Sequence, residues 1–184
     1  MKIGFGTCLF VGFVGGAALA RTASGQAAGG PGVAAQASAP SVSAADRKFF
    51  AAAAEGGMSE VELGRMAAAR GSNADVKAFG QHMVDDHTKV NASLKSLAAK
   101  KGVTLPSDVG AGNRKVAESL SRLSGSAFDQ AYMKAMVQDH VEDVAEFQKQ
   151  STAANDTDLR AFAAKNLPTL KHHLEMARAF PATS

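Results

Sequence analysis

The sequence predicts an all-α fold made of four long helices that pair as two hairpins. Apolar residues recur at helical spacing over four segments of similar length, which glycines and helix-capping residues separate. Alanine is abundant and aromatic residues make up only 6% of the 184 residues, a composition that disfavours a β-sandwich or a β-barrel. The second half of the predicted helical region also repeats the first half at a shift of 83 residues.

Residues 1–20 have the pattern of a secretory signal peptide. Lys2 precedes an uncharged apolar run from Ile3 to Leu19, and Ala18 to Ala20 provides the small residues of a cleavage site. A second cleavage position follows Ala27. A retained membrane anchor is the alternative, although the run is barely long enough to span a bilayer and is rich in glycine. We therefore predict an exported protein, in the periplasm or beyond, with no transmembrane span once the signal is removed.

Residues 21–45 are predicted to form a flexible tether, because Gly, Ala, Ser, Pro and Gln with a single charge cannot bury a core. The helical domain then covers 46–181, where 18 basic residues face 17 acidic ones. A net charge this small gives no reason to expect binding to nucleic acid. Cys8, the only cysteine, leaves with the signal peptide, so neither a disulfide framework nor a cysteine-based zinc site is expected.

Most of the predicted helices begin at a capping residue and end at a glycine or a proline, whereas the third long helix ends just before the caps Asn155 and Asp156. The long helices are expected over 46–70, from 72 or 73 to 102, over about 126–153 and over about 155–180, with a short amphipathic helix over 113–123. Ser126 and Asp129 form a weak capping-box pattern at the start of the third long helix.

The 83-residue repeat predicts how the helices connect. It aligns 73–79 with 156–162, and it also pairs Asp46 with Asp129 and Phe49 with Tyr132. Two hairpins related by a pseudo-two-fold axis explain this match. The 24 residues between them, 102–125, are long enough to cross the full length of a helical bundle. Short loops within the pairs and one long crossover between them define the ferritin-like four-helix bundle, here with a short extra helix in the crossover.

Each long helix places one polar side chain that can bind a metal on its apolar stripe: Glu60, His87, His140 and His173. In the ferritin-like arrangement all four lie within a turn or two of the middle of the bundle. A carboxylate and three imidazoles in an apolar interior must be paired, hydrogen-bonded or bound to a cation. The set predicts a site for one transition-metal ion such as zinc, iron or copper. The alternative is a metal-free buried network of the same side chains.

Other polar residues near the four candidate ligands are weaker candidates for metal binding. Asp143 and Glu62 are weak ligand candidates, whereas Asp86 and Asp139, each next to a stripe histidine, are expected to be solvated or salt-bridged. His82 and His172 are expected to face outward. A methionine lies one turn from each predicted ligand region, at Met83, Met136 and Met176, and would favour copper. Methionine at this spacing more often fills a core.

The sequence favours a protein that is not an enzyme. It contains no recognisable catalytic or cofactor-binding residue. It has no Ser-His-Asp order, no phosphate-binding loop and no H-E-x-x-H motif. The Glu-x-x-His pattern of ferritin-like carboxylate enzymes is also missing, because Val84, Val137 and Leu170 stand three residues before the histidines. The leading hypothesis is therefore a metal-binding bundle. The second is a structural or interaction module of the cell envelope, related to stress. The third is a metal-dependent oxidoreductase.

Five motifs resemble the bacterial domain-of-unknown-function family 4142: Glu60 to Gly64, Met83 to His87, Phe128 to Tyr132, Met136 to His140 and Leu167 to Leu174. The resemblance covers about Asp46 to Phe180. It implies a ferritin-like bundle and export, with peripheral association with the outer membrane, because members are described as outer-membrane or exported proteins. It places the motif histidines and the motif acid on the four candidate ligands and implies no established activity.

Overall fold

The structure is a computed structural model that describes residues 42–181, which form five helices and no strand. The helices are α1 (Ala44–Arg70), α2 (Ala74–Lys100), α3 (Gly110–Ser121), α4 (Gly125–Ala153) and α5 (Thr157–Ala179). The all-α prediction is confirmed for this part of the chain. The predicted signal peptide and residues 21–41 of the predicted tether lie outside the described residues. Among the helices of 42–181, none combines the length and the apolar character that crossing a membrane requires.

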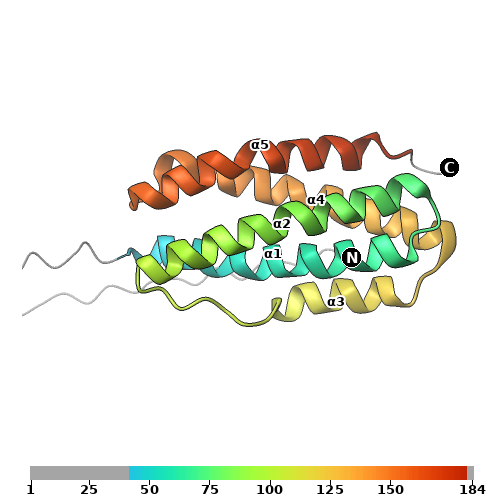
Figure 1. The fold of residues 1–184 in the computed structure, drawn as a ribbon, viewed down its shortest axis with the longest axis horizontal. Helices are drawn as coiled ribbons and strands as arrows, with labels where there is room; N and C mark the ends of the chain where they lie inside the picture. The colour runs from blue at the N-terminus through green and yellow to red at the C-terminus, as the bar shows by residue number, and fades with distance from the viewer. Residues whose placement is uncertain (1–41, 182–184) are drawn as a thin grey trace, which may run out of the picture. The chain divides into compact units, whose positions relative to one another are not determined.

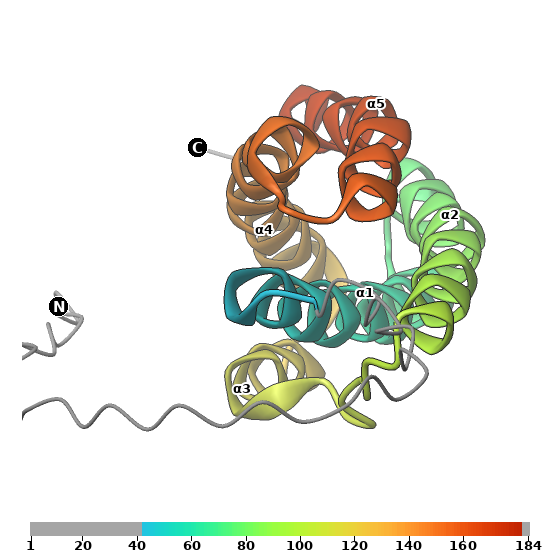
Figure 2. The same cartoon turned by 90° about the vertical axis from the view of Figure 1, so that its left-hand side faces the viewer.

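The four long helices pair as two hairpins. α1 packs against α2, and α4 packs against α5 (Figure 1). Seen end-on, α1, α2, α5 and α4 surround a common interior, and α3 lies outside them against α1 and α4 (Figure 2). The connection that contains α3 runs back along α1, so the turns of the two hairpins lie at opposite ends (Figure 1).

The apolar interior consists of two clusters of buried side chains. Phe50, Leu94 and Leu159 belong to the first cluster, near the α4–α5 turn. Phe79, Phe128 and other residues near the α1–α2 turn form the second cluster. Each of the four long helices contributes to both clusters. Between the two clusters lies the stretch of each helix that carries a predicted metal ligand, so polar side chains interrupt the core near the middle.

Two helix starts differ from the prediction because of local caps. α1 begins at Ala44, two residues early, since the Ser43 Oγ accepts a hydrogen bond from the Asp46 backbone N–H at 3.0 Å. α3 begins at Gly110, where the Asp108 carboxylate accepts the backbone N–H at 2.7 Å. Gly110 has a φ of 77°, a conformation that favours glycine.

The capping box predicted at the start of α4 is wrong, because Asp129 reaches across to the other hairpin. Its carboxylate, 2% exposed, accepts the backbone N–H groups of Ser72 at 3.0 Å and Asn73 at 2.8 Å, and also the Ser72 hydroxyl. These groups lie in the α1–α2 turn. The first turn of α4 is thereby tied to the turn of the α1–α2 hairpin.

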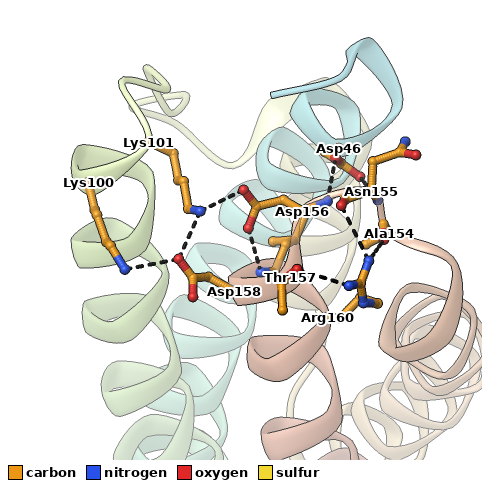
Figure 3. A network of polar contacts seen from close by, with 10 residues as sticks. Asp46, Lys100, Lys101, Ala154, Asn155, Asp156, Thr157, Asp158 and Arg160 are labelled. Atoms are coloured by element: carbon orange, nitrogen blue, oxygen red, sulfur yellow. Dashed lines mark hydrogen bonds and ion pairs between the residues drawn. The ribbon is translucent and has the colours of Figure 1, made fainter. Parts of the chain in front are cut away.

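Asp46 makes the equivalent contact at the opposite end. Its buried carboxylate accepts the backbone N–H groups of Asn155 at 3.1 Å and Asp156 at 3.2 Å, in the α4–α5 turn (Figure 3). Asp46 and Asp129 are partners in the 83-residue repeat, and so are the two turns that they bind. The repeat is therefore visible as two matching carboxylate clamps, each joining the start of one hairpin to the turn of the other.

Ion pairs surround the clamp at the α4–α5 turn. The Lys101 ammonium lies 2.6 Å from Asp156 and 2.8 Å from Asp158, and Lys100 lies 2.9 Å from Asp158 (Figure 3). The pairs join the basic C-terminus of α2 to the acidic N-terminus of α5, which also suits the dipoles of both helices. The Lys100–Asp158 pair is exposed and contributes modestly, whereas Lys101 and Asp156 are half-buried.

α3 is held in place by the end of α1. The Arg70 guanidinium donates hydrogen bonds to the carbonyl oxygens of Ser121 at 3.0 Å and Leu123 at 2.8 Å. It also lies 5.6 Å from the centre of the Phe128 ring in α4. The short helix is therefore fixed at its C-terminal end against α1 and α4.

The backbones of α1 and α2 touch at a pair of glycines. A Cβ atom on Gly80 would lie 2.7 Å from the Gly64 carbonyl oxygen and 2.7 Å from the Ala68 nitrogen. Only a residue without a side chain permits this approach. Gly56, in contrast, has nothing within 4 Å of the same position.

Removing a clamp should destabilise the domain. We expect Asp129→Ala, and separately Asp46→Ala, to lower the free energy of unfolding by about 2–4 kcal/mol, because each leaves two backbone N–H groups without their acceptor. Urea denaturation followed by circular dichroism measures the change. The matched control is Asp85→Ala on the exposed face of α2, which should change stability by less than about 0.5 kcal/mol. A loss below about 1 kcal/mol for both clamp variants would contradict the assignment.

The two glycines predict opposite effects for the same substitution. Gly80→Ala should lower the free energy of unfolding by about 1–3 kcal/mol, because the new methyl group forces the helices apart. Gly56→Ala should raise it by about 0.5–1 kcal/mol, since alanine favours a helix and the site is open. Thermal and urea unfolding of both variants measure the difference. Equal effects would show that the close approach of α1 and α2 is not needed.

Candidate metal centre

The four side chains predicted from the sequence meet in the interior, each from a different long helix. Glu60 (α1), His87 (α2), His140 (α4) and His173 (α5) are all at most 2% exposed. Ring nitrogens of the three histidines lie within 4.8 Å of one another. Glu60 is not in that group and instead belongs to a second one, with Asp139 and His140. The structure thus brings the predicted residues together as two adjoining groups that share His140.

Oxygen acceptors fix one nitrogen of the His87 ring and one of the His140 ring. His87 Nδ1 lies 2.7 Å from Glu60 Oε2, and His140 Nδ1 lies 3.0 Å from the Met136 carbonyl oxygen. A carbonyl oxygen can only accept, so His140 Nδ1 carries the hydrogen. When Glu60 is ionised, as it must be to bind a metal, its Oε2 can only accept, so His87 Nδ1 then carries the hydrogen. The Nε2 atom of each neutral ring is then left as a lone pair.

His173 follows the same pattern with its nitrogens exchanged. Its Nε2 lies 3.2 Å from Asp86 Oδ2, which leaves Nδ1 as the lone-pair atom. This Nδ1 lies 3.2 Å from His87 Nε2. Two lone pairs at this distance repel each other unless a cation or a proton lies between them. Two ligands of one tetrahedral ion, each about 2.05 Å from it, are about 3.3 Å apart, so the observed spacing fits neighbouring ligands.

Three buried atoms of the second group have no hydrogen-bond partner within residues 42–181: Glu60 Oε1, Asp139 Oδ2 and His140 Nε2. Glu60 Oε1 and His140 Nε2 lie 3.5 Å apart. Buried polar atoms are nearly always paired, so three such atoms close together indicate a missing cation, water or proton. Glu60 therefore has one oxygen that orients His87 and one that is free to bind.

Asp139 and Asp143 are functional candidates that the sequence analysis undervalued. Asp139 was expected to be solvated or salt-bridged, but only part of its side chain is exposed, 34%, and its Oδ2 is buried beside His140. Asp143 lies next to Glu60 in the interior. The repeat could have identified Asp143, since it is the partner of Glu60 at the shift of 83. No sequence signal marks Asp139, because its contact with Glu60 is made across to α1.

The remaining sequence predictions concern residues near the centre. Asp86 pairs with Lys89 at 3.2 Å, as expected, and also holds His173. Glu62 is exposed, so it is Glu60 that faces the core. His82 and His172 are exposed as predicted. Met83 and Met136 are buried in the second apolar cluster, as the core-filling interpretation predicts, and Met176 packs against the same cluster.

Burial favours the neutral form of each group in the centre. It lowers the pKa of His140 to about 3 and that of His173 to about 4, and it also lowers the pKa of His87. Burial raises the pKa of Glu60 to about 8 and that of Asp139 to about 8. The three imidazoles are thus unprotonated near neutral pH, which is the state that binds a metal.

The comparisons with known proteins identify a family. The family described as a domain of unknown function (DUF4142) matches residues 31–180. The match covers most of the chain, so the chain belongs to this family. No curated protein and no solved structure matches the chain. The family description names no activity, so the function must be argued from the centre itself.

The lowered histidine pKa values predict a loss of stability in acid. His140 has a pKa of 6.5 when unfolded and about 3 when folded, so below pH 6.5 only the unfolded chain gains its proton. Its contribution to stability is complete above pH 6.5 and is lost as the pH falls towards 3. The free energy of unfolding of the parent, relative to His140→Gln, should fall by about 1 kcal/mol between pH 6.5 and about 5.5.

Urea denaturation with a chelator present measures this difference at each pH. The matched control is His82→Gln, since His82 is exposed, and its difference from the parent should stay constant. The buried carboxyl groups act in the opposite direction, but they are present in both proteins and largely cancel. A parent that gains stability over His140→Gln on acidification would show that the folded protein protonates His140.

Proposed function

We propose that this chain is an exported, ferritin-like helical bundle that binds one transition-metal ion between His87, His140 and His173. The observation that carries the proposal is the meeting of three lone-pair nitrogens, each on a ring whose other nitrogen an oxygen holds. This is the arrangement that orients metal-binding histidines in proteins, where an outer oxygen fixes the ring and leaves the second nitrogen for the metal.

Glu60 Oε1 becomes the fourth ligand in this proposal when its side chain moves towards the ion, because Glu60 lies outside the group formed by the three histidines. This oxygen lies 3.5 Å from His140 Nε2. The Glu60 carboxyl also neighbours those of Asp139 and Asp143. Three imidazole nitrogens and one carboxylate oxygen suit a borderline ion such as zinc, iron or copper. The carboxylate would also balance part of the charge of the cation in an apolar interior, where an uncompensated ion is costly.

The sequence and the topology support the rest of the proposal. Two tightly turned hairpins, with a long connection between them and turns at opposite ends, agree with the ferritin-like arrangement. Export, with peripheral association with the outer membrane, rests on the signal-like pattern of residues 1–20 and on the family resemblance. A binding role is favoured over an oxidoreductase because the Glu-x-x-His pairs of di-iron enzymes are missing.

A metal-free network in a structural module of the cell envelope is the second candidate. It is favoured by the Glu60–His87 contact of 2.7 Å and by the distance of 3.2 Å between His87 and His173, across which one proton could be shared. In this candidate a second proton, on Glu60 Oε1, must satisfy His140 Nε2, and the distance of 3.5 Å between these two atoms is long for a hydrogen bond.

Metal analysis of protein made without a histidine tag separates the two candidates. We expect one equivalent of zinc, iron or copper per chain, and loss of this metal in the double variant His87→Gln, His140→Gln. The matched control, His82→Gln with His172→Gln, should keep its metal, because both side chains are exposed. Zinc at about 100 times its dissociation constant should stabilise the metal-free parent by about 2.7 kcal/mol.

Circular dichroism confirms that each variant is folded before its metal is measured. Metal-free parent protein whose melting is unchanged by zinc, copper or iron would contradict the metal-binding function and favour the structural module.

A further inference from the structure

We propose a second cation position beside the histidine centre, formed by Glu60 and by Asp139, which lines a surface pocket through which a hydrated divalent cation reaches the three histidines. This inference rests on the proposed metal-binding function and identifies the route by which the ion arrives.

The pocket lies between α1, α3 and α4 and has a volume of about 190 Å³. Val116, Gln138 and Glu142 are exposed and lie at its mouth. Ser59 and Met136 are buried and lie at its inner end. Ser59 precedes Glu60, and the Met136 carbonyl oxygen accepts the His140 hydrogen bond. A volume of this size holds several waters, so a small divalent ion can enter the pocket with its hydration shell.

Asp139 connects this pocket to the buried centre. Its side chain lines the pocket and is 34% exposed, yet its Oδ2 is buried without a hydrogen-bond partner within 42–181. On the inner side, Glu60 Oε1 and His140 Nε2 are unpartnered as well, and both residues are at most 2% exposed. One atom from each of the three residues lies within 4.8 Å of the other two. Two carboxylates and a ring nitrogen therefore face the same small space.

The ligand chemistry of the lining favours this pocket as the route for a cation. Asp139 and Glu142 contribute carboxyl oxygens, and no lysine, arginine or histidine lines the pocket. Asp86 also approaches the centre from the surface, but it is in an ion pair with Lys89. It also contacts His173 at Nε2, which is not the lone-pair nitrogen. A cation approaching past Asp86 would meet the Lys89 ammonium and the protonated Nε2 of His173, which cannot bind it.

The shared histidine explains how an ion would move inward. A cation held by Asp139 and Glu60 is already next to His140 Nε2, which also belongs to the three-histidine group. The ion can replace its waters with protein ligands one at a time, so that no bare ion crosses the apolar interior. Asp139 would thus increase the rate at which the metal ion is taken up, whereas the three histidines determine how tightly the ion is held.

Stopped-flow uptake of Co²⁺ by the metal-free full chain tests the route, with the visible absorption of nitrogen-bound Co²⁺ as the readout. Val116→Phe fills the mouth of the pocket without touching a ligand. It should bind one Co²⁺ per chain with the final spectrum of the parent, but at least about tenfold more slowly. The matched control is Val141→Phe, which enlarges another exposed valine, on α4, and should take up Co²⁺ at the parental rate.

Asp139→Asn tests the carboxyl group itself, because it replaces an oxygen ligand for the cation with a weakly binding amide and keeps the shape. Its uptake should also slow by at least about tenfold, since the incoming ion loses one of the two carboxyl groups that replace its waters. Asp85→Asn removes an exposed carboxylate of α2 and should leave the rate unchanged. Circular dichroism checks that each variant is folded.

Parental uptake rates in both Val116→Phe and Asp139→Asn would overturn the route while leaving the histidine centre intact. Loss of bound Co²⁺ in Asp139→Asn, together with parental uptake in Val116→Phe, would make Asp139 a permanent ligand and would also overturn the route. A parent that binds no Co²⁺ at all would instead overturn the proposed function, and this inference with it.

Discussion

Two buried carboxylates keep the hairpins in register, and the centre depends on that register. Asp46 and Asp129 each bind two backbone N–H groups in the turn of the opposite hairpin. A helix that slides by one residue moves its side chains by about 1.5 Å along the axis and about 100° around it. The candidate ligands come from four different helices, so such a slip in any one of them would disperse the group. The clamps, near the two ends of the hairpins, therefore position atoms that lie near the middle.

The framework is symmetric, but its chemistry is not. Under the 83-residue repeat the positions of His87, His140 and His173 correspond to Leu170, Gly57 and Val90, none of which binds metals. Only the carboxylates keep the symmetry, since Glu60 corresponds to Asp143. A duplicated hairpin explains the clamps and the pair of acids. Each histidine is therefore present in one hairpin and absent from the matching position of the other, so the symmetric fold carries a single asymmetric site.

Local signals in the sequence were enough to predict the helices, whereas the site needed contacts that no local pattern contains. Caps and glycines act within a few residues, so helix ends such as Arg70 and Ala153 were predicted accurately. The apolar stripes likewise identified Glu60 and the three histidines. Asp129 was misassigned because its carboxylate binds residues more than fifty positions away. Asp139 was missed because its environment depends on α1 and on the pocket beside α3, and the hydrogen on each ring depends on oxygens such as Asp86 Oδ2.

The polar layer between the two apolar clusters has a consequence for how the domain opens. Hydrophobic burial stabilises the two apolar clusters on either side of the polar layer, whereas the layer itself contributes little to the free energy of unfolding. The layer is therefore a seam, a weakly stabilised boundary between two units that can each unfold locally. In the metal-free protein the units on either side can fluctuate separately, and hydrogen exchange would report two protection levels. An ion held by ligands from both hairpins would join the units across the seam. Metal loading then changes the cooperativity of the domain, because two partly independent halves become one.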